Sequence, residues 1–264
     1  MSLLQVRGLG LDPGGGCLVR DLDLRIEAGQ CWVVMGRNGA GKSTLLRTLA
    51  GLTRPHTGSV LIADTPVDRL AARERARRIG LVFQHSDAGF HSTTLQMALS
   101  GGYANHAGWG WENETQTATA LDALDAVGLR GLADRPLESL SGGELRRAEI
   151  ARLLVQQPAL AMLDEPLNHL DIGQQIAMLR LLLQRCRNQQ QALVLVLHDL
   201  NLARQVASHV LLLYGDGHWQ AGEAAALGNA ETLTRLLGYP LREIETPGGR
   251  QLGIDFRDAG LTGN

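Results

Sequence analysis

The apolar residues of this chain gather in short uninterrupted runs that are bounded by glycine, proline or charged residues. Such runs are typical of strands buried on both faces of a sheet. They occur at Cys31 to Met35, Ile79 to Phe83, Leu160 to Leu163 and Leu193 to Leu197. Segments of helical character separate them, at Thr44 to Ala50, Asp68 to Arg78 and Gln174 to Arg187. This alternation of strands and helices predicts an α/β core sheet.

Three stretches depart from the alternation. The N-terminal residues predict short antiparallel strands at Leu3 to Val6 and Leu22 to Ile26, joined by a glycine turn. Residues 85–157 are mostly helical in character, with helices predicted at Thr115 to Val127 and Ser141 to Leu154.

The C-terminal stretch predicts a helix followed by a hairpin around Gly248. We therefore expect one domain of 264 residues. Its core would comprise residues 1–84 and 158–230, with a helical subdomain at 85–157 and a C-terminal extension at 231–264.

Composition narrows the class of protein. A net charge of −2 and a pI near 6.4 argue against nucleic acid as the main partner. The spacing of Cys17, Cys31 and Cys186 fits neither a zinc site nor a disulfide framework, which favours a reducing compartment. No signal segment opens the chain, and no apolar run approaches the roughly 20 residues of a membrane helix. We expect a soluble, cytoplasmic protein whose membrane role, if it has one, depends on a separate subunit.

A phosphate-binding loop follows the strand that ends at Met35. The segment has the form G-x-x-x-x-G-K-[ST] and comprises Gly36, Arg37, Asn38, Gly39, Ala40, Gly41, Lys42, Ser43 and Thr44. Lys42 is the only lysine among 25 Lys and Arg residues, at a position where a compact ammonium must reach between phosphate oxygens. The glycines allow backbone N–H groups to point inward, Lys42 would bridge the β- and γ-phosphates, and the Ser43 hydroxyl would ligate Mg²⁺. The loop predicts that the chain binds a nucleoside triphosphate.

Two adjacent carboxylates, Asp164 and Glu165, end the apolar run at Leu160 to Leu163. A buried strand delivers such groups to the ligand crevice at the carboxyl edge of a parallel sheet. There Asp164 would face Mg²⁺, and Glu165 would act as general base on the attacking water. An ordinary turn containing Asp-Glu-Pro is the alternative explanation of the same residues.

Ser141, Gly142, Gly143 and Glu144 open the second predicted helix of the subdomain. Serine followed by glutamate three residues later is a capping box. Capping does not explain two glycines in the first turn, because each lowers helix propensity by up to ~1 kcal/mol. A close approach to this backbone, with phosphate as the candidate group, is the alternative.

These motifs together resemble the ATP-binding cassette (ABC) ATPases. Leu140 to Glu144 looks like the signature motif of that family, and it lies between the phosphate loop and the Asp-Glu strand in the family's order. Gln84 matches the glutamine loop, Asn168 to Asp171 the D-loop, and His198 the switch histidine. The resemblance covers roughly Gly36 to His198 and implies a P-loop NTPase (RecA-like) core.

The resemblance also implies roles that the residues alone do not show. ABC ATPases work as head-to-tail dimers, so ATP would lie between the phosphate loop of one copy and Ser141 to Glu144 of the other. Gln84 would join the Mg²⁺ shell and sense the transport subunit. His198 would hold the γ-phosphate and the attacking water, whereas from sequence alone it could equally be a buried histidine.

Two features that concern aromatic residues have more than one explanation. The family stacks adenine on an aromatic residue, and Pro13 stands at that position here, so preference for ATP over GTP is inferred from the family alone. Gly101 to Trp111 holds Tyr103, His106, Trp109 and Trp111. Core packing is the commonest explanation of these residues, and a ligand site or a surface facing a membrane partner are the alternatives.

A single cassette without membrane helices resembles the separate ATPase subunit of a bacterial importer. Such a subunit works with a polytopic permease and, indirectly, with a substrate-binding protein. Asp164 to Asp171 and His198 to Ala203 look most like the subfamily that imports iron-siderophores, haem and cobalamin. A soluble ATPase without a transport role, such as one serving iron–sulfur cluster assembly, is the alternative. A module that binds ATP without turnover is a third, and Glu165 together with His198 argues against it.

Overall fold

The computed structural model describes residues 2–84, 92–105, 114–188, 191–247 and 249–255. The order of its elements follows the predicted alternation. The strands are β1 Ser2–Leu11, β2 Val19–Glu27, β3 Cys31–Gly36, β4 Thr57–Ile62, β5 Thr65–Pro66, β6 Ile79–Val82, β7 Leu160–Asp164, β8 Ala192–Val196, β9 His209–Leu213, β10 Trp219–Glu223, β11 Leu241–Thr246 and β12 Gly249–Ile254. The α-helices are α1 Lys42–Leu49, α2 Ala72–Arg78, α3 Thr94–Ser100, α4 Glu114–Ala126, α5 Gly142–Gln156, α6 Ile172–Asn188, α7 Leu200–Val206, α8 Ala224–Leu227 and α9 Ala230–Leu237. Short 3-10 turns lie at η1 Val67–Arg69, η2 Gly101–Ala104, η3 Arg130–Leu132 and η4 Leu137–Ser139.

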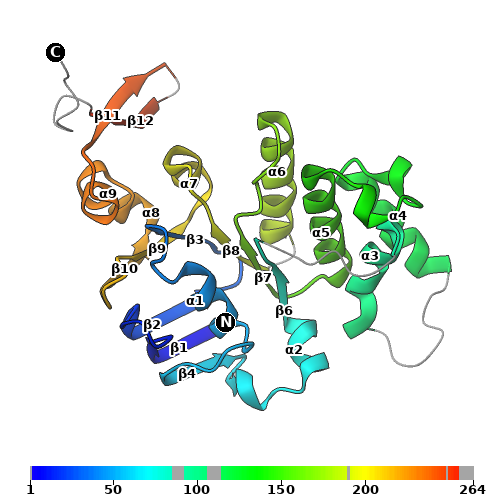
Figure 1. Ribbon diagram of the computed structural model, residues 1–264, viewed down its shortest axis with the longest axis horizontal. Helices are drawn as coiled ribbons and strands as arrows, with labels where there is room; N and C mark the ends of the chain where they lie inside the picture. Colours follow the sequence, from blue (N-terminus) through cyan, green and yellow to red (C-terminus); the bar gives the residue numbers. More distant parts are fainter. Residues whose placement is uncertain (1, 85–91, 106–113, 189–190, 248, 256–264) are drawn as a thin grey trace.

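The central sheet has the strand order β10-β9-β3-β8-β7-β6 (Figure 1). Strands β6, β7, β8, β3 and β9 pair in parallel, whereas β10 joins β9 as an antiparallel edge strand. Every residue of β7 and β8 is buried, as expected for strands covered on both faces. The carboxyl ends of β3, β7 and β8 therefore reach one edge of the sheet, where the predicted site residues follow them.

The two faces of β3 belong to two different cores. Trp32 and Val34 pack with α1 and with an antiparallel sheet of order β2-β1-β4-β5. Cys31, Val33 and Met35 face the opposite core, which includes α5 and α6. Helix α1 thus lies between the two sheets, and it packs there through Leu45, Leu46 and Leu49.

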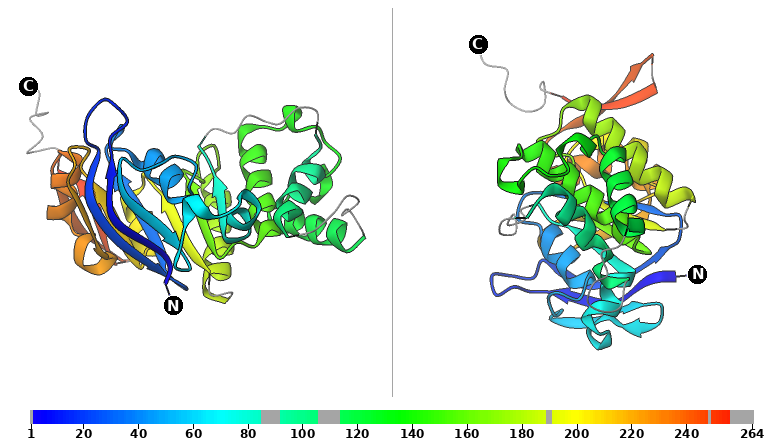
Figure 2. Two further views of the ribbon diagram at one scale, coloured as in Figure 1. Left: turned by 90° about the horizontal axis from the view of Figure 1, so that it is seen from below. Right: turned by 90° about the vertical axis from the view of Figure 1, so that its right-hand side faces the viewer.

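Helices α3, α4 and α5 pack together as a lobe beside the β6 edge of the central sheet, as the second set of views shows (Figure 2). This arrangement confirms the predicted fold class: a P-loop core sheet, N-terminal antiparallel strands and an inserted helical subdomain. In the C-terminal region, α9 is followed by the hairpin of β11 and β12.

Two boundaries differ from the sequence prediction for physical reasons. Strand β1 runs to Leu11, beyond the predicted Val6, because Gly8 takes a positive φ of 55° at a bulge and the pairing with β4 resumes at Gly10. The helix predicted over Asp68 to Arg78 divides into η1 and α2, because Leu70 is extended and its side chain is buried in the core.

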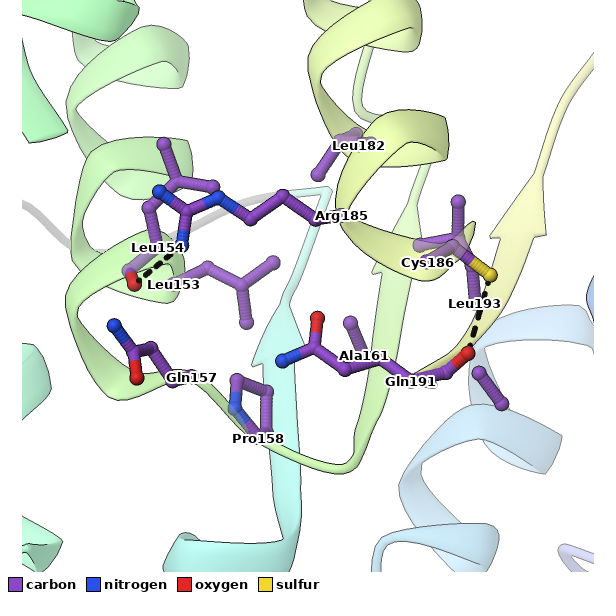
Figure 3. A pocket seen from close by; sticks show the side chains of 11 residues that line it. Leu153, Leu154, Gln157, Pro158, Ala161, Leu182, Arg185, Cys186, Gln191 and Leu193 are labelled. Carbon is purple, nitrogen blue, oxygen red and sulfur yellow. Dashed lines mark hydrogen bonds between the residues drawn. The ribbon is translucent and has the colours of Figure 1, made fainter. Parts of the chain in front are cut away.

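Within the described parts of the chain, no helix is long and apolar enough to cross a membrane. Cys17, Cys31 and Cys186 are free thiols, and burial raises the pKa of Cys31 to about 12. Cys186 lines a small cavity of about 20 Å³ between α5, α6, β7 and β8, with its Sγ 3.2 Å from the backbone oxygen of Gln191 (Figure 3). This cavity is apolar and lies apart from the predicted site residues.

Candidate active site

The phosphate loop leaves β3 and enters α1 through two residues with left-handed backbone. Gly39 has φ 82° and Gly41 has φ 93°, values that only glycine adopts at little cost. The Nζ of Lys42 donates to the backbone oxygens of Gly36, at 2.9 Å, and Arg37, at 3.0 Å. The ammonium therefore lies inside the curve of the loop, where a phosphate would exchange with those carbonyls.

The pKa of Lys42 lies below its ordinary value. Burial of the ammonium lowers it, and the charges of Glu165 and Asp164 offset part of that effect. Lys42 is thus a desolvated cation that faces two carboxylates. An added polyanion would pair with such a group more strongly than with a solvated lysine.

A pocket of about 640 Å³ opens above this loop. Its lining comes from separate parts of the chain: Leu18, Asn38, Gly39, Gly41, Lys42, Ser43, Thr44, Gln84, Glu165 and His198. Residues far apart in sequence, at the ends of β3, β6, β7 and β8, therefore meet at one opening. The volume is in the range of pockets that hold cofactors and small ligands.

Glu165 is the centre of the polar network at this pocket. Its Oε2 accepts hydrogen bonds from Nε2 of Gln84, at 2.8 Å, and from Nδ2 of Asn168, at 2.6 Å. Its Oε1 lies 2.6 Å from Nε2 of His198, which carries the hydrogen because an ionised carboxylate only accepts. The backbone of Glu165 has φ 50°, which marks it as a residue held in an uncommon conformation.

Opposing effects set the pKa of Glu165. Burial raises it, but hydrogen bonds from His198 and Asn168, together with the charges of His198 and Lys42, outweigh burial and hold the pKa below its ordinary value. With a side chain 11% exposed, Glu165 remains an ionised carboxylate near neutral pH. An ionised carboxylate at the mouth of a phosphate site can accept a proton from water.

Asp164 is 2% exposed, and its Oδ1 is buried without a hydrogen-bond partner among the described residues. A buried carboxylate oxygen is costly unless it meets a cation or a donor. The described residues contain no group of three or more His, Cys, Asp or Glu side chains that could hold a metal alone. The unpartnered oxygen of Asp164 fits Mg²⁺, which is held by one or two carboxylates together with substrate phosphates and water.

Ser141 is the N-cap of α5, and both halves of the capping box form. Its hydroxyl accepts from the N–H of Glu144 at 3.3 Å, and Oε2 of Glu144 accepts from the N–H of Ser141 at 2.8 Å. Hydrogen bonds to the Glu144 carboxylate from the backbone N–H and the side chain of Ser141 lower the pKa of Glu144. Within the described part of the chain, Ser141, Gly142, Gly143 and Glu144 do not line the phosphate-loop pocket of their own copy.

The two glycines of this helix start differ in their surroundings. A Cβ on Gly143 would lie 2.7 Å from the backbone oxygen of His169, whereas one on Gly142 would meet only the His169 ring at 3.5 Å. The D-loop backbone therefore gives Gly143 a packing reason to be glycine, and the approach of phosphate to both glycines stays a prediction. At Gly142 an incoming group remains the open explanation.

Asn168 and Leu18 belong to the site, although sequence reasoning gave neither a role in it. The position of Asn168, three residues after Glu165 in a tight turn, could have indicated its contact with the carboxylate. Nothing in the sequence distinguished Leu18, which lines the pocket and would touch a side chain at Gly41. Pro13, at the aligned adenine-stacking position, is exposed and is not among the described residues that line the pocket.

Tyr103 is 63% exposed, so the prediction that it packs in the core is wrong. It lies in η2, which turns over α5 and leaves the ring at the surface. His106, Trp109 and Trp111 lie outside the described residues. His198 is also not a buried histidine, since half of its side chain is exposed at the pocket.

Comparison with known proteins identifies this arrangement. A model of the ABC transporter family matches residues 19–168. The chain belongs to the ABC transporter family. Family membership confirms the resemblance drawn from the motifs, and the chain is an ATPase that binds ATP.

Curated relatives extend over almost the whole chain. The hemin import ATP-binding protein HmuV of Myxococcus xanthus (strain DK1622) is 37% identical over 252 residues, which is 93% of each protein. The ferric enterobactin transport ATP-binding protein FepC of Escherichia coli (strain K12) is 36% identical, covering 93% of this chain and 92% of FepC.

Among solved structures, a metal-chelate type ABC transporter in an inward-facing conformation matches with a TM-score of 0.83 and 27% identity. It covers 98% of this chain and 100% of that one. A dimeric, post-hydrolysis ATP-binding cassette bound to ADP and Pi matches with a TM-score of 0.75 and 26% identity, covering 83% of this chain and 98% of that one.

Proposed function

We propose that this ATPase powers a bacterial importer of a metal chelate such as an iron-siderophore, haem or cobalamin. Relatives that import hemin and ferric enterobactin support this substrate class. The single observation that carries the hydrolytic function is the convergence of Lys42, Gln84, Glu165 and His198 on one pocket. That convergence also disfavours a module that binds ATP without turnover.

Each of these residues has a role in the proposed hydrolysis of ATP. The loop amides from Gly36 to Thr44 and the Lys42 ammonium bind the β- and γ-phosphates, and they stabilise charge that spreads over the γ-phosphate oxygens. Glu165 takes a proton from the attacking water as its oxygen bonds to the γ-phosphorus and the bond to ADP breaks. His198, 2.6 Å from Glu165, orients that water and the γ-phosphate.

Ser43, Gln84 and Asp164 hold Mg²⁺ in this proposal. When bound, the ion neutralises phosphate charge. Gln84 would ligate the ion through Oε1, and its Nε2 can still donate to Glu165 because the amide oxygen and nitrogen are separate groups.

A second copy of the chain completes the site in this proposal. Ser141, Gly142, Gly143 and Glu144 lie outside their own copy's pocket, and they would contact the γ-phosphate bound by the other copy. Ile172, directly after the D-loop, is 75% exposed, which suits a surface that becomes covered. The dimeric relative bound to ADP and Pi supports this arrangement.

The permease would dock beside the glutamine loop. A groove of about 350 Å³ runs between α2, β6, η2 and α5, and exposed Leu52 and Tyr103 lie at it. Phe83, the residue before Gln84, also lines this groove. A permease segment seated there would lie next to the hydrolytic site, and the chain would work at the cytoplasmic face of the cell membrane, with a substrate-binding protein on the opposite side.

The proposed division of labour follows the predicted segments. The core at 1–84 and 158–230 binds nucleotide, and the helical subdomain at 85–157 carries Ser141 to Glu144 to the second copy. The extension at 231–264 has no role in hydrolysis in this proposal.

The test combines turnover with partner capture. Glu165→Gln should keep ATP binding and lower kcat by roughly 10²–10⁴-fold, the range of a general base. Lys42→Ala is the matched variant that should lose binding as well. Tagged Glu165→Gln protein, held with ATP and recovered from detergent-solubilised membranes, should bring down a polytopic permease that mass spectrometry identifies. Normal turnover by Glu165→Gln would overturn its role, and recovery of only iron–sulfur assembly proteins would favour the soluble alternative.

A further inference from the structure

Arg146 is a buried arginine on α5, close to the start of that helix, with a side chain 5% exposed. Its guanidinium reaches the ends of two strands of the central sheet. Nη1 donates to the backbone oxygen of Phe83 at 2.6 Å, and Nη2 donates to those of Gln84 at 3.2 Å and Glu165 at 3.3 Å, with Asp164 at 3.5 Å.

These carbonyls belong to the residues that surround the hydrolytic centre. Gln84 follows β6, while Asp164 ends β7 and Glu165 follows it, and the side chains of Gln84 and Glu165 bond each other at 2.8 Å. Arg146 therefore connects the backbones of Gln84 and Glu165, whose side chains also contact each other. The backbone connection does not depend on that side-chain contact.

Glu149, one turn further along α5, supplies the counter-charge. Its Oε2 lies 2.7 Å from Nη1 of Arg146, and both side chains are buried. A buried ion pair adds little net stability, because desolvation of the charges offsets their attraction. The network is thus poorly explained as a stabilising device alone, whereas its geometry fits the holding of two strand ends in register.

We propose that Arg146 is a positioning residue that fixes the Gln84 and Glu165 backbones relative to each other and to the helix that begins at Ser141. The inference rests on the proposed roles of Glu165 and Gln84 in hydrolysis. Ser141 caps α5, and Arg146 lies on the same helix. The residues proposed to meet the second copy and the arginine that positions Glu165 therefore move as one element. Arg146 also holds Phe83, whose side chain lines the groove proposed for the permease.

The proposal depends on the planar fork of donors that only arginine presents. A lysine could keep the ion pair with Glu149, but a point charge cannot serve carbonyls on two strands at once. Arg146→Lys should therefore fold and bind ATP normally, while kcat falls roughly 10–100-fold, as for other small misplacements of catalytic groups. The KM for ATP should stay within about twofold, since the phosphate loop is held by β3 and α1.

Two further variants keep the test decisive. Arg146→Gln combined with Glu149→Gln removes both buried charges, so no unpaired carboxylate is left to unfold the protein. Arg185→Gln is the control. Arg185 also donates to a backbone oxygen of another element, with Nη1 3.5 Å from the oxygen of Leu154 (Figure 3), but it does not line the described part of the phosphate-loop pocket. We expect the charge-free pair to lose kcat as Arg146→Lys does, and the control to keep it.

A double-mutant cycle with Gln84→Ala separates positioning from general loosening. If Arg146 acts through the glutamine loop, Gln84→Ala should reduce kcat much less in the Arg146→Lys background than in the wild type. Wild-type kcat in folded Arg146→Lys, or fully additive losses, would overturn the proposal. If Glu165→Gln itself turns over ATP normally, the assigned general base fails instead, whatever the Arg146 variants do.

Discussion

At the scale of single residues, the Glu165 carboxylate is the centre of the hydrogen-bond network in the pocket. Glu165 binds donors from Gln84, Asn168 and His198, which come from three different segments of the chain. These hydrogen bonds hold the pKa of Glu165 below its ordinary value and keep it ionised near neutral pH. A carboxylate offers about four acceptor sites, so in our proposal the three donors leave room for the attacking water.

The lowered pKa of Glu165 predicts a pH dependence of stability. A carboxyl whose folded pKa lies below its ordinary value of 4.5 stabilises the fold above that pH, and the contribution is lost as pH falls through the lower folded pKa. We expect the difference in urea midpoint between wild type and Glu165→Ala to be largest above about pH 5 and to shrink by pH 3. A difference that grows on acidification would contradict the assigned network. Asp125→Ala, at an exposed carboxylate of α4, is the control.

At the scale of elements, the contact between α5 and the D-loop explains part of the signature motif. The backbone oxygen of His169 lies where a Cβ on Gly143 would stand, while Gly142 has room for one. A short helix start thus serves two neighbours: its own D-loop at Gly143 and, in our proposal, a phosphate at Gly142.

The two glycines predict different outcomes for the same substitution. Gly143→Ala should lower the free energy of unfolding by about 1–3 kcal/mol, the usual cost of overpacking, and should lower kcat as well. Gly142→Ala should leave the thermal midpoint near that of the wild type and still reduce kcat, because only the ATP-bound dimer needs that space. Thermal unfolding and ATPase assays on both variants check this. Full activity in folded Gly142→Ala would remove the phosphate from that position.

At the scale of the whole molecule, our proposal divides the hydrolytic site between two copies of the chain. The phosphate loop joins β3 to α1, whereas Ser141 to Glu144 begin α5 in the helical lobe and do not line the described part of that pocket. A second copy, related head to tail, brings its lobe to the first copy's loop. Isologous pairing of this kind creates two equivalent sites.

Mixing two inactive variants tests that pairing. Lys42→Ala destroys the loop of its own copy, and Ser141→Arg destroys the group offered to the other copy. A mixed dimer keeps one intact site, formed by the loop of the Ser141→Arg chain and the helix start of the Lys42→Ala chain. Random mixing should restore about a quarter of the wild-type sites. The ATPase rate of the mixture, compared with each variant alone, measures this, and no recovery would argue against a composite site.

Local sequence determined the chemistry of this protein, because its chemical motifs are contiguous. The loop from Gly36 to Thr44, the two acids at the end of β7 and the cap at Ser141 depend on neighbours a few residues away, so their spacing predicts where they lie in the elements. The α/β alternation follows similarly from the runs that build β3, β6, β7 and β8. The extension of β1 past Gly8 and the packing of Gly143 on the His169 backbone both depend on contacts with distant segments.

Tertiary structure alone decided which side chains meet across the chain. Arg146 donates hydrogen bonds to backbone oxygens about 20 to 60 residues away in the sequence. No periodicity or spacing predicts these bonds, because they depend on how β6 and β7 pair and how α5 packs on them. The exposure of Tyr103 and the place of Leu18 beside the loop likewise arise from packing between elements. Sequence therefore supplied the reactive groups, and the sheet's parallel pairing, which places strand ends at one edge, arranged them into a site.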